Sequence, residues 1–409
     1  MARRRSDLDR PSLTFYNESV QTSAAPSSVH PFVRCRTTWL AYSLLAYMTF
    51  IPSALGPLMP YIRQEMDLSY TLGALHLSVI ALGMILSGLT ADRLLAFFGR
   101  RRLLWAGSIV SLVGALGLAL NRVILLTLPS ALLMGISGSL LVIMIQAILS
   151  DVHGDQRTIA LTESNVAASL SSLLAPLWAS ALLRLGFSWR LALGSGLIAL
   201  VVIAVFFKGT IIPAGSAPGV KQPANPQKLP GVFWACWVVI ILVVSVEWCM
   251  IFWSADYLEK VVGLARVDAV TAVSLFFLAM LAGRIAGSYL ARRFSAMAIL
   301  LCALALALVG FPLFWLGRHP WMNLAGIFIT GFGVANLFPL AMSAAIGLAA
   351  KQVDLASSRV TLASGSAIFG APLALGWLAD QVSIQRAYIV VAPLLLAAIL
   401  LTWWLRRRL

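Results

Sequence analysis

Residues 189–207 read WRLALGSGLIALVVIAVFF, an apolar run with a single charged side chain. Residues 387–405 form a second such run with no charged side chain. A helix that crosses the hydrocarbon core of a bilayer needs about 20 mainly apolar residues. Strands of a membrane barrel would instead alternate polar and apolar residues over roughly 10 positions. These long, unalternating runs therefore predict membrane-spanning α-helices.

The composition of the chain supports the same conclusion. Of its 409 residues, 60% are hydrophobic and 11% are charged, whereas a soluble domain has about 25% charged residues. Such a chain cannot cover a water-facing surface, so lipid must surround most of it. In lipid every backbone N–H and C=O needs an internal partner, which helices supply. We therefore predict an all-α membrane protein.

The apolar runs predict twelve transmembrane helices. Their approximate ranges are 38–59, 69–91, 102–120, 123–148, 158–183, 189–207, 232–255, 268–290, 295–316, 321–347, 357–379 and 387–405.

The longest polar break, 208–230, divides the spans into six and six. We predict a disordered cytoplasmic N-terminal tail at 1–37 and an N-terminal six-helix bundle at 38–207. A cytoplasmic central loop follows at 208–231, and a C-terminal six-helix bundle at 232–409.

The basic residues predict the orientation. The formal net charge is +15, but the cations occur in short clusters between apolar runs rather than along one basic face, so no nucleic-acid partner is expected. With the N-terminus inside, 21 of the 30 Lys and Arg fall in inner segments and 8 in outer segments, while Arg284 lies within a span. Cytoplasmic loops carry this excess of positive charge. Both termini are expected in the cytoplasm, with a bacterial cytoplasmic (inner) membrane as host.

The two halves of the chain repeat each other. Ala175-Pro176-Leu177 corresponds to Ala371-Pro372-Leu373 at an offset of 196 positions, as Arg190 does to Arg386 and Gly135 to Gly331. Because each half has an even number of spans, the two bundles should be pseudo-symmetric and share one orientation. Two such bundles can rock about a central site, which alternating access requires.

A short loop after the second span carries a family resemblance. It reads Gly88-Leu89-Thr90-Ala91-Asp92-Arg93 and then Gly99-Arg100-Arg101-Arg102. This resembles the signature loop G-x-x-x-D-R…G-R-R-R of the major facilitator superfamily, which lies between its second and third helices. The second half has a partial copy, with Gly283-Arg284 and Arg292-Arg293, in which Ala291 replaces the Asp. The resemblance extends from about residue 38 to the end of the chain.

The resemblance implies a cytoplasmic latch. Asp92 can accept hydrogen bonds from a helix N-terminus, which in the family is that of the eleventh helix. The Arg cluster can bind lipid phosphate or acidic groups of the other half. The alternative is that these cations only determine topology. The residues assigned to the latch are Gly88, Asp92, Arg93, Gly99, Arg100 and Arg101, with Arg359 at the inner end of the eleventh span.

Two ionisable residues within spans are candidates for coupling. A charged side chain inside a membrane costs roughly 2.5–3.5 kcal/mol on insertion scales, so it is presumed functional. Glu247 lies in the seventh span, which in the family lines the central cavity, and it could carry a proton or contact solute. His76 lies in the second span, and the reference pKa of histidine, about 6.5, suits proton handling. Either residue could instead be a structural packing or hydrogen-bonding group.

Other residues are candidates for a gate and for a substrate cavity. Glu163 in the fifth span and Arg284 in the eighth could pair as a cytoplasmic gate, because these helices meet between the bundles in the family. Separate pairing within each half is the alternative. Aromatic and polar residues that could shape a substrate cavity, or merely pack, are Tyr42, Tyr47, Trp248, Trp253 and Asn336.

Together these features predict a secondary active transporter of a small organic solute. It should work by alternating access and be proton-coupled and self-sufficient as a monomer, and it could be an exporter. A sugar or organic-acid uptake permease, or an uncoupled facilitator, would have the same architecture; the sparse hydrogen-bonding groups favour export. A membrane-embedded enzyme would need a cluster of catalytic groups, and none is evident. The cysteines show no metal-ligand spacing, so neither metal nor cofactor is expected.

Overall fold

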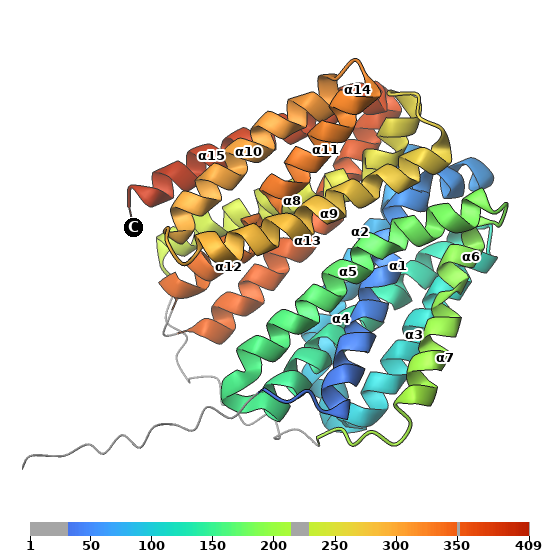
Figure 1. The fold of residues 1–409 in the computed structure, drawn as a ribbon, viewed down its shortest axis with the longest axis vertical. Coiled ribbons are helices and arrows are strands. Elements are labelled where there is room, and N and C mark those ends of the chain that lie inside the picture. Colours follow the sequence, from blue (N-terminus) through green and yellow to red (C-terminus); the bar gives the residue numbers. More distant parts are fainter. Residues whose placement is uncertain (1–31, 214–228, 350–351, 409) are drawn as a thin grey trace, which may run out of the picture. The chain divides into compact units, whose positions relative to one another are not determined.

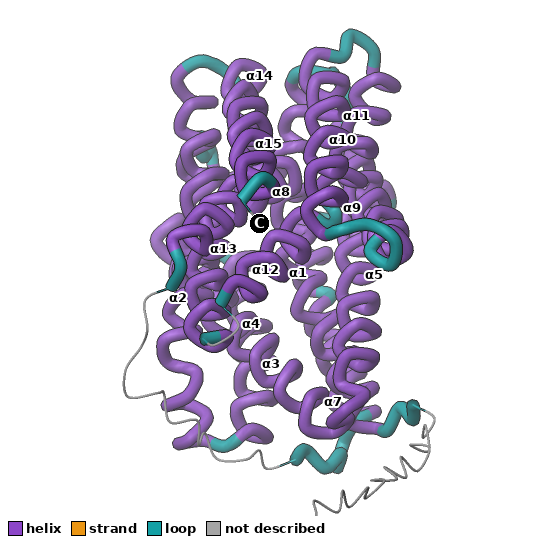
Figure 2. The backbone as a smooth tube through the Cα atoms, turned by 90° about the vertical axis from the view of Figure 1, so that its left-hand side faces the viewer, coloured by secondary structure: helices purple, strands orange, loops and turns teal. Residues whose placement is uncertain are grey.

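The structure is a computed structural model that describes residues 32–213, 229–349 and 352–408. These residues are helical and contain no strand (Figure 2). Eleven stretches among them are long and apolar enough to cross a membrane, and one of these, Ile124–Arg184, contains two consecutive α-helices. The predicted all-α membrane fold with twelve spans is therefore confirmed.

Two groups of helices follow each other along the chain (Figure 1). The N-terminal bundle contains α1 (Arg36–Met66), α2 (Tyr70–Phe98), α3 (Arg100–Leu120), α4 (Ile124–His153), α5 (Arg157–Arg184), α6 (Trp189–Gly194) and α7 (Gly196–Phe206). The C-terminal bundle contains α8 (Gly231–Lys260), α9 (Arg266–Leu290), α10 (Ala296–Leu316), α11 (Pro320–Val334), α12 (Leu337–Leu348), α13 (Val353–Gln381), α14 (Ile384–Ala387) and α15 (Val391–Arg406). Most of the predicted tail and residues 214–228 of the predicted central loop lie outside the described residues.

Three predicted spans are interrupted, and in the twelfth a 3₁₀ turn, Tyr388–Val390, separates α14 from α15. The sixth divides into α6 and α7 at Ser195, which stands between two glycines with low helix propensity. The tenth divides into α11 and α12 at Ala335 and Asn336. There the Asn336 side-chain amide donates a hydrogen bond of 2.6 Å to the Gly283 carbonyl of α9.

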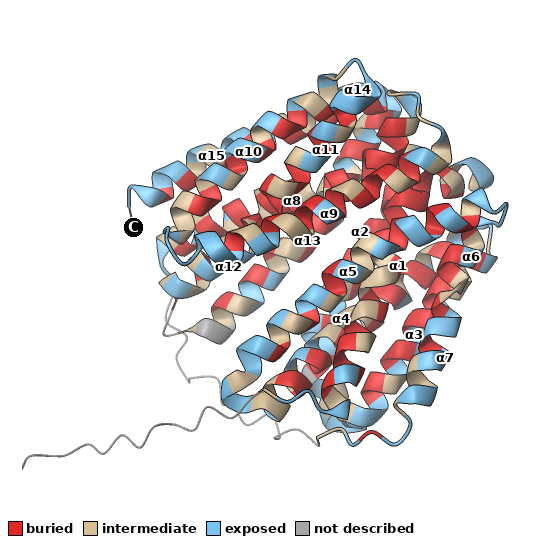
Figure 3. Cartoon of the chain, viewed as in Figure 1, coloured by how far each residue is buried: buried red, intermediate tan, exposed pale blue. Residues whose placement is uncertain are grey.

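Equivalent pairs of helices are in contact in the two bundles. Within the N-terminal bundle α2 packs on α4, α3 on α4 and α1 on α5; the corresponding pairs in the C-terminal bundle are α9 on α11, α10 on α11 and α8 on α13. The main contacts between the bundles are those of α1 with α8, α2 with α13, and α5 with α9, and α1 also contacts α9. Buried residues occur along the helices of both bundles, as the red segments of the ribbon in Figure 3 show.

The repeat persists at individual close contacts. A Cβ added to Gly135 of α4 would lie 2.1 Å from the Ile80 carbonyl oxygen, and one on Gly331 of α11 would lie 2.8 Å from that of Phe276. Ile80 and Phe276 are separated by the same 196 positions as the two glycines. Glycine is needed at both positions because only a residue without a Cβ lets the two backbones approach this closely.

Each bundle has two ends, which we call distal and proximal. The distal end is where α1 passes into α2 and α8 into α9. The proximal end is where α1 and α8 begin and α7 ends. Because α1 and α8 both run from the proximal to the distal end, equivalent residues of the two repeats lie at similar levels.

Candidate functional site

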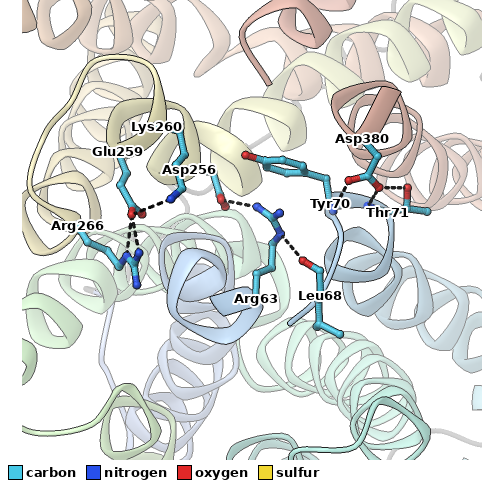
Figure 4. Close-up of polar contacts among 9 residues, drawn as sticks. All are labelled: Arg63, Leu68, Tyr70, Thr71, Asp256, Glu259, Lys260, Arg266 and Asp380. Atoms are coloured by element: carbon cyan, nitrogen blue, oxygen red, sulfur yellow. Dashed lines mark hydrogen bonds and ion pairs between the residues drawn. The ribbon is translucent and has the colours of Figure 1, made fainter. Parts of the chain in front are cut away.

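A buried ion pair joins α1 to α8 at the distal end (Figure 4). The Arg63 Nη1 donates to the Asp256 Oδ1 at 2.7 Å, and the two side chains are 14% and 1% exposed. The guanidinium also lies over the Tyr70 ring, 3.4 Å from its centroid. Burial of two charges is tolerated only with close pairing, and the cation–π contact adds stabilisation. Arg63 therefore ties the start of α2 and the end of α8 to α1.

A carboxylate from the other bundle caps α2. Asp380, at the end of α13, accepts hydrogen bonds from the Tyr70 N–H at 2.7 Å and the Thr71 N–H at 2.8 Å, and from the Thr71 hydroxyl at 2.6 Å. The first N–H groups of a helix have no partner within it, and negative charge is favoured at this end of the helix dipole. Asp380 thus holds the distal ends of α2 and α13 together.

An ion pair joins α5 to α9, with the basic residue on the N-terminal bundle and the acidic residue on the C-terminal bundle. Arg184, at the end of α5, donates to Asp268 in the first turn of α9 at 2.5 Å. Nearby, Arg266 donates to Glu259 at 2.9 Å from Nε and 2.7 Å from Nη2, and it also donates to the Gln64 side chain of α1. The α1–α8, α2–α13 and α5–α9 pairs therefore all carry polar contacts at the distal end, and Gln64 and Arg266 supply one between α1 and α9.

These distal residues are related by the internal repeat. Arg184 and Asp380 are 196 positions apart, as are Arg63 and Glu259, and Tyr70 and Arg266. The sequence identifies Arg63, Arg184 and Arg266 only as cations of the outer segments. It does not indicate that Asp256 pairs with Arg63 or that Asp268 pairs with Arg184. Charged positions that recur at the repeat offset near span ends were the signal that could have found them.

Close contacts between the bundles continue along α1, α8 and α13 for one to two helical turns inward from the distal end. The Trp253 indole N–H donates to the Pro372 carbonyl at 2.9 Å, its ring packs edge-on against Tyr70 at 5.4 Å, and it is fully buried. A Cβ added to Gly56 of α1 would lie 2.6 Å from the Ile251 carbonyl oxygen of α8. Trp253 therefore belongs to the packed distal closure rather than to the predicted substrate cavity.

Glu247 and Trp248 lie next to this closure on its proximal side. From Val243 to Leu258, these are the two residues of α8 that are not buried. They stand one helical turn before Ile251 and Phe252, which meet α1 at Gly56, so they share the α1-facing side of α8. Among the described residues the Arg284 guanidinium of α9 is the charge that acts on the Glu247 carboxylate. Glu247 is thus a half-buried acidic residue within the span.

The structure does not form the predicted pair between Glu163 and Arg284. Glu163 accepts hydrogen bonds from Arg34 at 2.8 and 2.5 Å and from the Tyr42 hydroxyl at 3.1 Å, all within the N-terminal bundle. Arg284 instead donates to the Ser169 hydroxyl of α5 at 2.5 Å. Ser169 is six residues beyond Glu163, or about 9 Å along a helix, so the two charges lie at different levels. Helices α5 and α9 do meet, as expected.

The surroundings of His76 favour a structural role over coupling. The side chain is fully buried between α2 and α4, with Nε2 2.9 Å from the Thr127 hydroxyl. Nδ1 lies 3.2 Å from the Leu72 carbonyl, which can only accept, so Nδ1 donates to it. The Thr127 hydroxyl also lies 3.3 Å from the Ile124 carbonyl of its own helix. Both ring nitrogens are thus occupied by neighbouring groups of the same bundle.

Three further cavity candidates, Tyr42, Tyr47 and Asn336, are enclosed by neighbouring protein groups. Tyr42 donates to Glu163, and Asn336 is bonded to the carbonyl of Gly283 in its own bundle. Tyr47 is 5% exposed, and its ring lies 3.6 Å from the position of a Cβ on Gly196 in α7. Its buried hydroxyl has no hydrogen-bond partner in the described part of the chain. Tyr47 and Asn336 therefore pack within single bundles, which leaves Trp248 as the partly accessible aromatic candidate.

The signature loop has the expected turn but a different partner. Gly99 has φ +74, a left-handed conformation that favours glycine, and it ends α2 where α3 begins. Arg100 pairs with Asp151 of α4 in its own bundle rather than with the other bundle. Arg93, Arg101 and Arg359 are exposed, and a Cβ on Gly88 would meet nothing within 4 Å. The Asp92 side chain lies outside the described part of the chain.

Comparison with known proteins establishes the class. The model of the Major Facilitator Superfamily matches residues 38–317 and 271–409, so the chain belongs to this family of membrane transporters. An uncharacterized MFS-type transporter of Yersinia pestis is 24% identical over 352 residues, which cover 84% of this chain and 89% of that protein. An uncharacterized transporter of Sinorhizobium fredii is 29% identical over 139 residues, 34% of this chain and 37% of that protein.

Solved structures share the fold. A bacterial homologue of the human lysosomal transporter Spinster, inward-facing and unoccupied, superposes with a TM-score of 0.71 at 13% identity, covering 92% of this chain and 98% of that one. A D-xylose–proton symporter gives 0.72 at 13% identity, with 90% and 97% covered. A peptide transporter in complex with sulfate gives 0.73 at 16% identity, with 91% and 94% covered. The predicted family resemblance is therefore confirmed.

Proposed function

We propose that this protein is a proton-coupled secondary transporter that moves a small organic solute across the membrane by alternating access, rather than an enzyme. The observation that carries the proposal is the position of Glu247, a half-buried acidic residue inside a span, directly proximal to a closed distal end. Both ion pairs that join the bundles between described residues, Arg63–Asp256 and Arg184–Asp268, are distal. A conformation closed at one end fits one half of an alternating-access cycle.

Glu247 is proposed as the proton carrier. Its carboxylate lacks a hydrogen-bond partner among the described residues, and holding such a charge within a membrane span is costly. Protonation would remove this cost, and the Arg284 guanidinium of α9 would stabilise the charged form when the proton leaves. Movement of the two bundles would then change the side from which the proton arrives. His76 has no part in this scheme.

The solute is proposed to be mostly apolar or cationic, and its direction outward. Tyr42 and Asn336 use their polar groups on protein partners, and Tyr47 and Trp253 are buried by packing. Few hydrogen-bonding groups are then left to hold a sugar, whereas Trp248 and Glu247 suit an aromatic or cationic solute.

We further propose that the proximal end faces the cytoplasm of a bacterial inner membrane, with both termini there and the protein acting as a monomer. In the opposite conformation, opened at the distal end, the proximal ends would close. Asp92, Arg93, Arg101 and Arg359 would then form the latch, with Gly88 and Gly99 allowing the close approach.

The test is transport in liposomes that contain a pH-sensitive dye. Wild type and Glu247→Gln are compared over a panel of organic cations, apolar compounds, sugars and organic acids, with the exposed Asp155→Asn as the matched control. We expect one solute class to drive proton movement in wild type and in Asp155→Asn, and no proton movement in Glu247→Gln. Solute flux without proton movement, unchanged in Glu247→Gln, would refute proton coupling and indicate a facilitator.

A further inference from the structure

A cavity of about 270 Å³ lies at the proximal end of the N-terminal bundle, away from the α1–α8 seam. It is formed by the first turns of α3, the last turns of α7 and the turn that follows α7. The lining residues are Arg101, Trp105, Ala204, Phe207, Lys208, Gly209 and Thr210. Two of them are cations and none is acidic, so the cavity attracts an anion.

A buried hydroxyl in this cavity has no partner. Thr210 is 6% exposed, and its Oγ1 is among the buried side-chain oxygens without a hydrogen-bond partner in the described part of the chain. Leaving such a group unpaired costs roughly 1–3 kcal/mol. A ligand with acceptor oxygens in the cavity would recover this cost by accepting a hydrogen bond from the hydroxyl.

The turn that presents this hydroxyl is held in place. Gly209 has φ +80, and the Thr210 N–H donates to the Phe207 carbonyl at 3.1 Å. The Arg36 guanidinium of α1 donates to the carbonyls of Phe206 at 2.6 Å and Lys208 at 3.4 Å. The site is thus preorganised by contacts within the N-terminal bundle, which lowers the entropic cost of binding.

The position of the cavity points to an amphiphile. It lies where α3 begins and α7 ends, at the level of a span's end, and Trp105 is of a residue type favoured at membrane interfaces. The neighbouring α7 surface is apolar and exposed, with Val201, Val205 and Phe206 at 51%, 68% and 70% exposure. The cationic part of the cavity therefore continues into a surface suited to acyl chains.

We propose that this cavity binds the phosphate group of an anionic phospholipid. Arg101 and Lys208 neutralise the phosphate charge, and the Thr210 hydroxyl donates a hydrogen bond to a phosphate oxygen. Trp105 and Phe207 contact the glycerol and the first acyl carbons. Charge-assisted hydrogen bonds of this kind are the stronger class in proteins, and basic pockets at the cytoplasmic side of spans suit lipid headgroups.

The test measures lipid retention by native mass spectrometry after delipidation and titration with phosphatidylglycerol or phosphatidylcholine. Wild type is compared with Thr210→Val and Lys208→Gln, and with Arg102→Gln as the matched control, because Arg102 is an exposed cation beside Arg101 that does not line the cavity. We expect wild type and Arg102→Gln to retain phosphatidylglycerol in preference to phosphatidylcholine. Thr210→Val and Lys208→Gln should each weaken phosphatidylglycerol binding at least fivefold.

Thermal unfolding in detergent separates binding from folding. Thr210→Val removes an unpaired hydroxyl, so without lipid its midpoint should equal or exceed that of wild type, while the stabilisation by phosphatidylglycerol should be lost. A lower midpoint without lipid would show a structural role for the hydroxyl and overturn the proposal. Equal retention of the two lipids by wild type would also overturn it. Stabilisation by inorganic phosphate equal to that by phosphatidylglycerol would replace the lipid with a free phosphate.

Discussion

Arg184 and Asp380 occupy equivalent positions of the two repeats, and each joins the end of its helix to the first turn of a helix in the other bundle. Asp380 accepts from backbone N–H groups of α2, whereas Arg184 donates to the Asp268 carboxylate of α9. The same closing position thus carries opposite charges in the two halves. The α2–α13 contact uses the backbone N–H groups at the start of α2, and the α5–α9 contact uses the Asp268 side chain in the first turn of α9.

Replacing Asp380 should loosen the distal closure. Asp380→Ala leaves two N–H groups of α2 without their partner, and because Asp380 is exposed we take the low end of the cost, about 1 kcal/mol. This is about a fivefold shift toward the distal-open population. Spin labels at Val123 and His319, exposed and equivalent in the two repeats, should report a longer distance by pulsed electron resonance. An unchanged distance distribution would contradict a closing role, and Asp155→Ala is the control.

Loss of the Arg184–Asp268 pair should have a smaller, salt-sensitive effect. Its side chains are 55% and 49% exposed, and exposed pairs contribute about 0.2–1 kcal/mol. Arg184→Gln should therefore shift the same label distance less than Asp380→Ala does. The difference from wild type should disappear near 1 M salt, where charges are screened within about 3 Å. A shift that persists at high salt would exclude an electrostatic origin.

Removing one partner of the buried Arg63–Asp256 pair should destabilise the protein strongly. A single buried charge without its partner costs about 3–5 kcal/mol, and the second Asp256 oxygen already lacks a partner. Arg63→Met and Asp256→Leu should each lower the midpoint of thermal unfolding in detergent, and the double variant should lose less than the two losses combined. Additive losses would mean that the pair contributes nothing as a unit.

A methyl group on Gly135 should disrupt packing of α4 on α2. The added Cβ would lie 2.1 Å from the Ile80 carbonyl oxygen, and overpacking of this kind costs about 1–3 kcal/mol. Gly138→Ala is the matched control on α4, since its Cβ would meet only the flexible end of Met48 at 3.1 Å. Gly135→Ala should lower the unfolding midpoint by several degrees while Gly138→Ala leaves it nearly unchanged. Equal midpoints would argue against a tight α2–α4 contact.

Much of the architecture was predictable because each span depends on its own residues. A run such as 102–120 must form a helix where lipid surrounds it, and it lies within one continuous helix, α3. The offset of 196 positions was visible in short matches such as Ala175-Pro176 with Ala371-Pro372. The interruption at Asn336 was not visible, because it depends on a hydrogen bond to Gly283 in another helix. Gly135 could be identified as a repeat position, but its contact with Ile80 could not.

The candidate site was predicted less well, because it depends on which helix faces meet and at what level. Glu247 could be identified from its charge within an apolar run, a property of local sequence. The partners of Glu163 and Arg284 were assigned from family topology, which does not specify the level of each charge along its helix. The sequence by itself determined the number of spans, the repeat and the family. Only the tertiary structure decided that Arg63, Asp256 and Asp380 close the distal end, since helix packing alone brings these distant residues together.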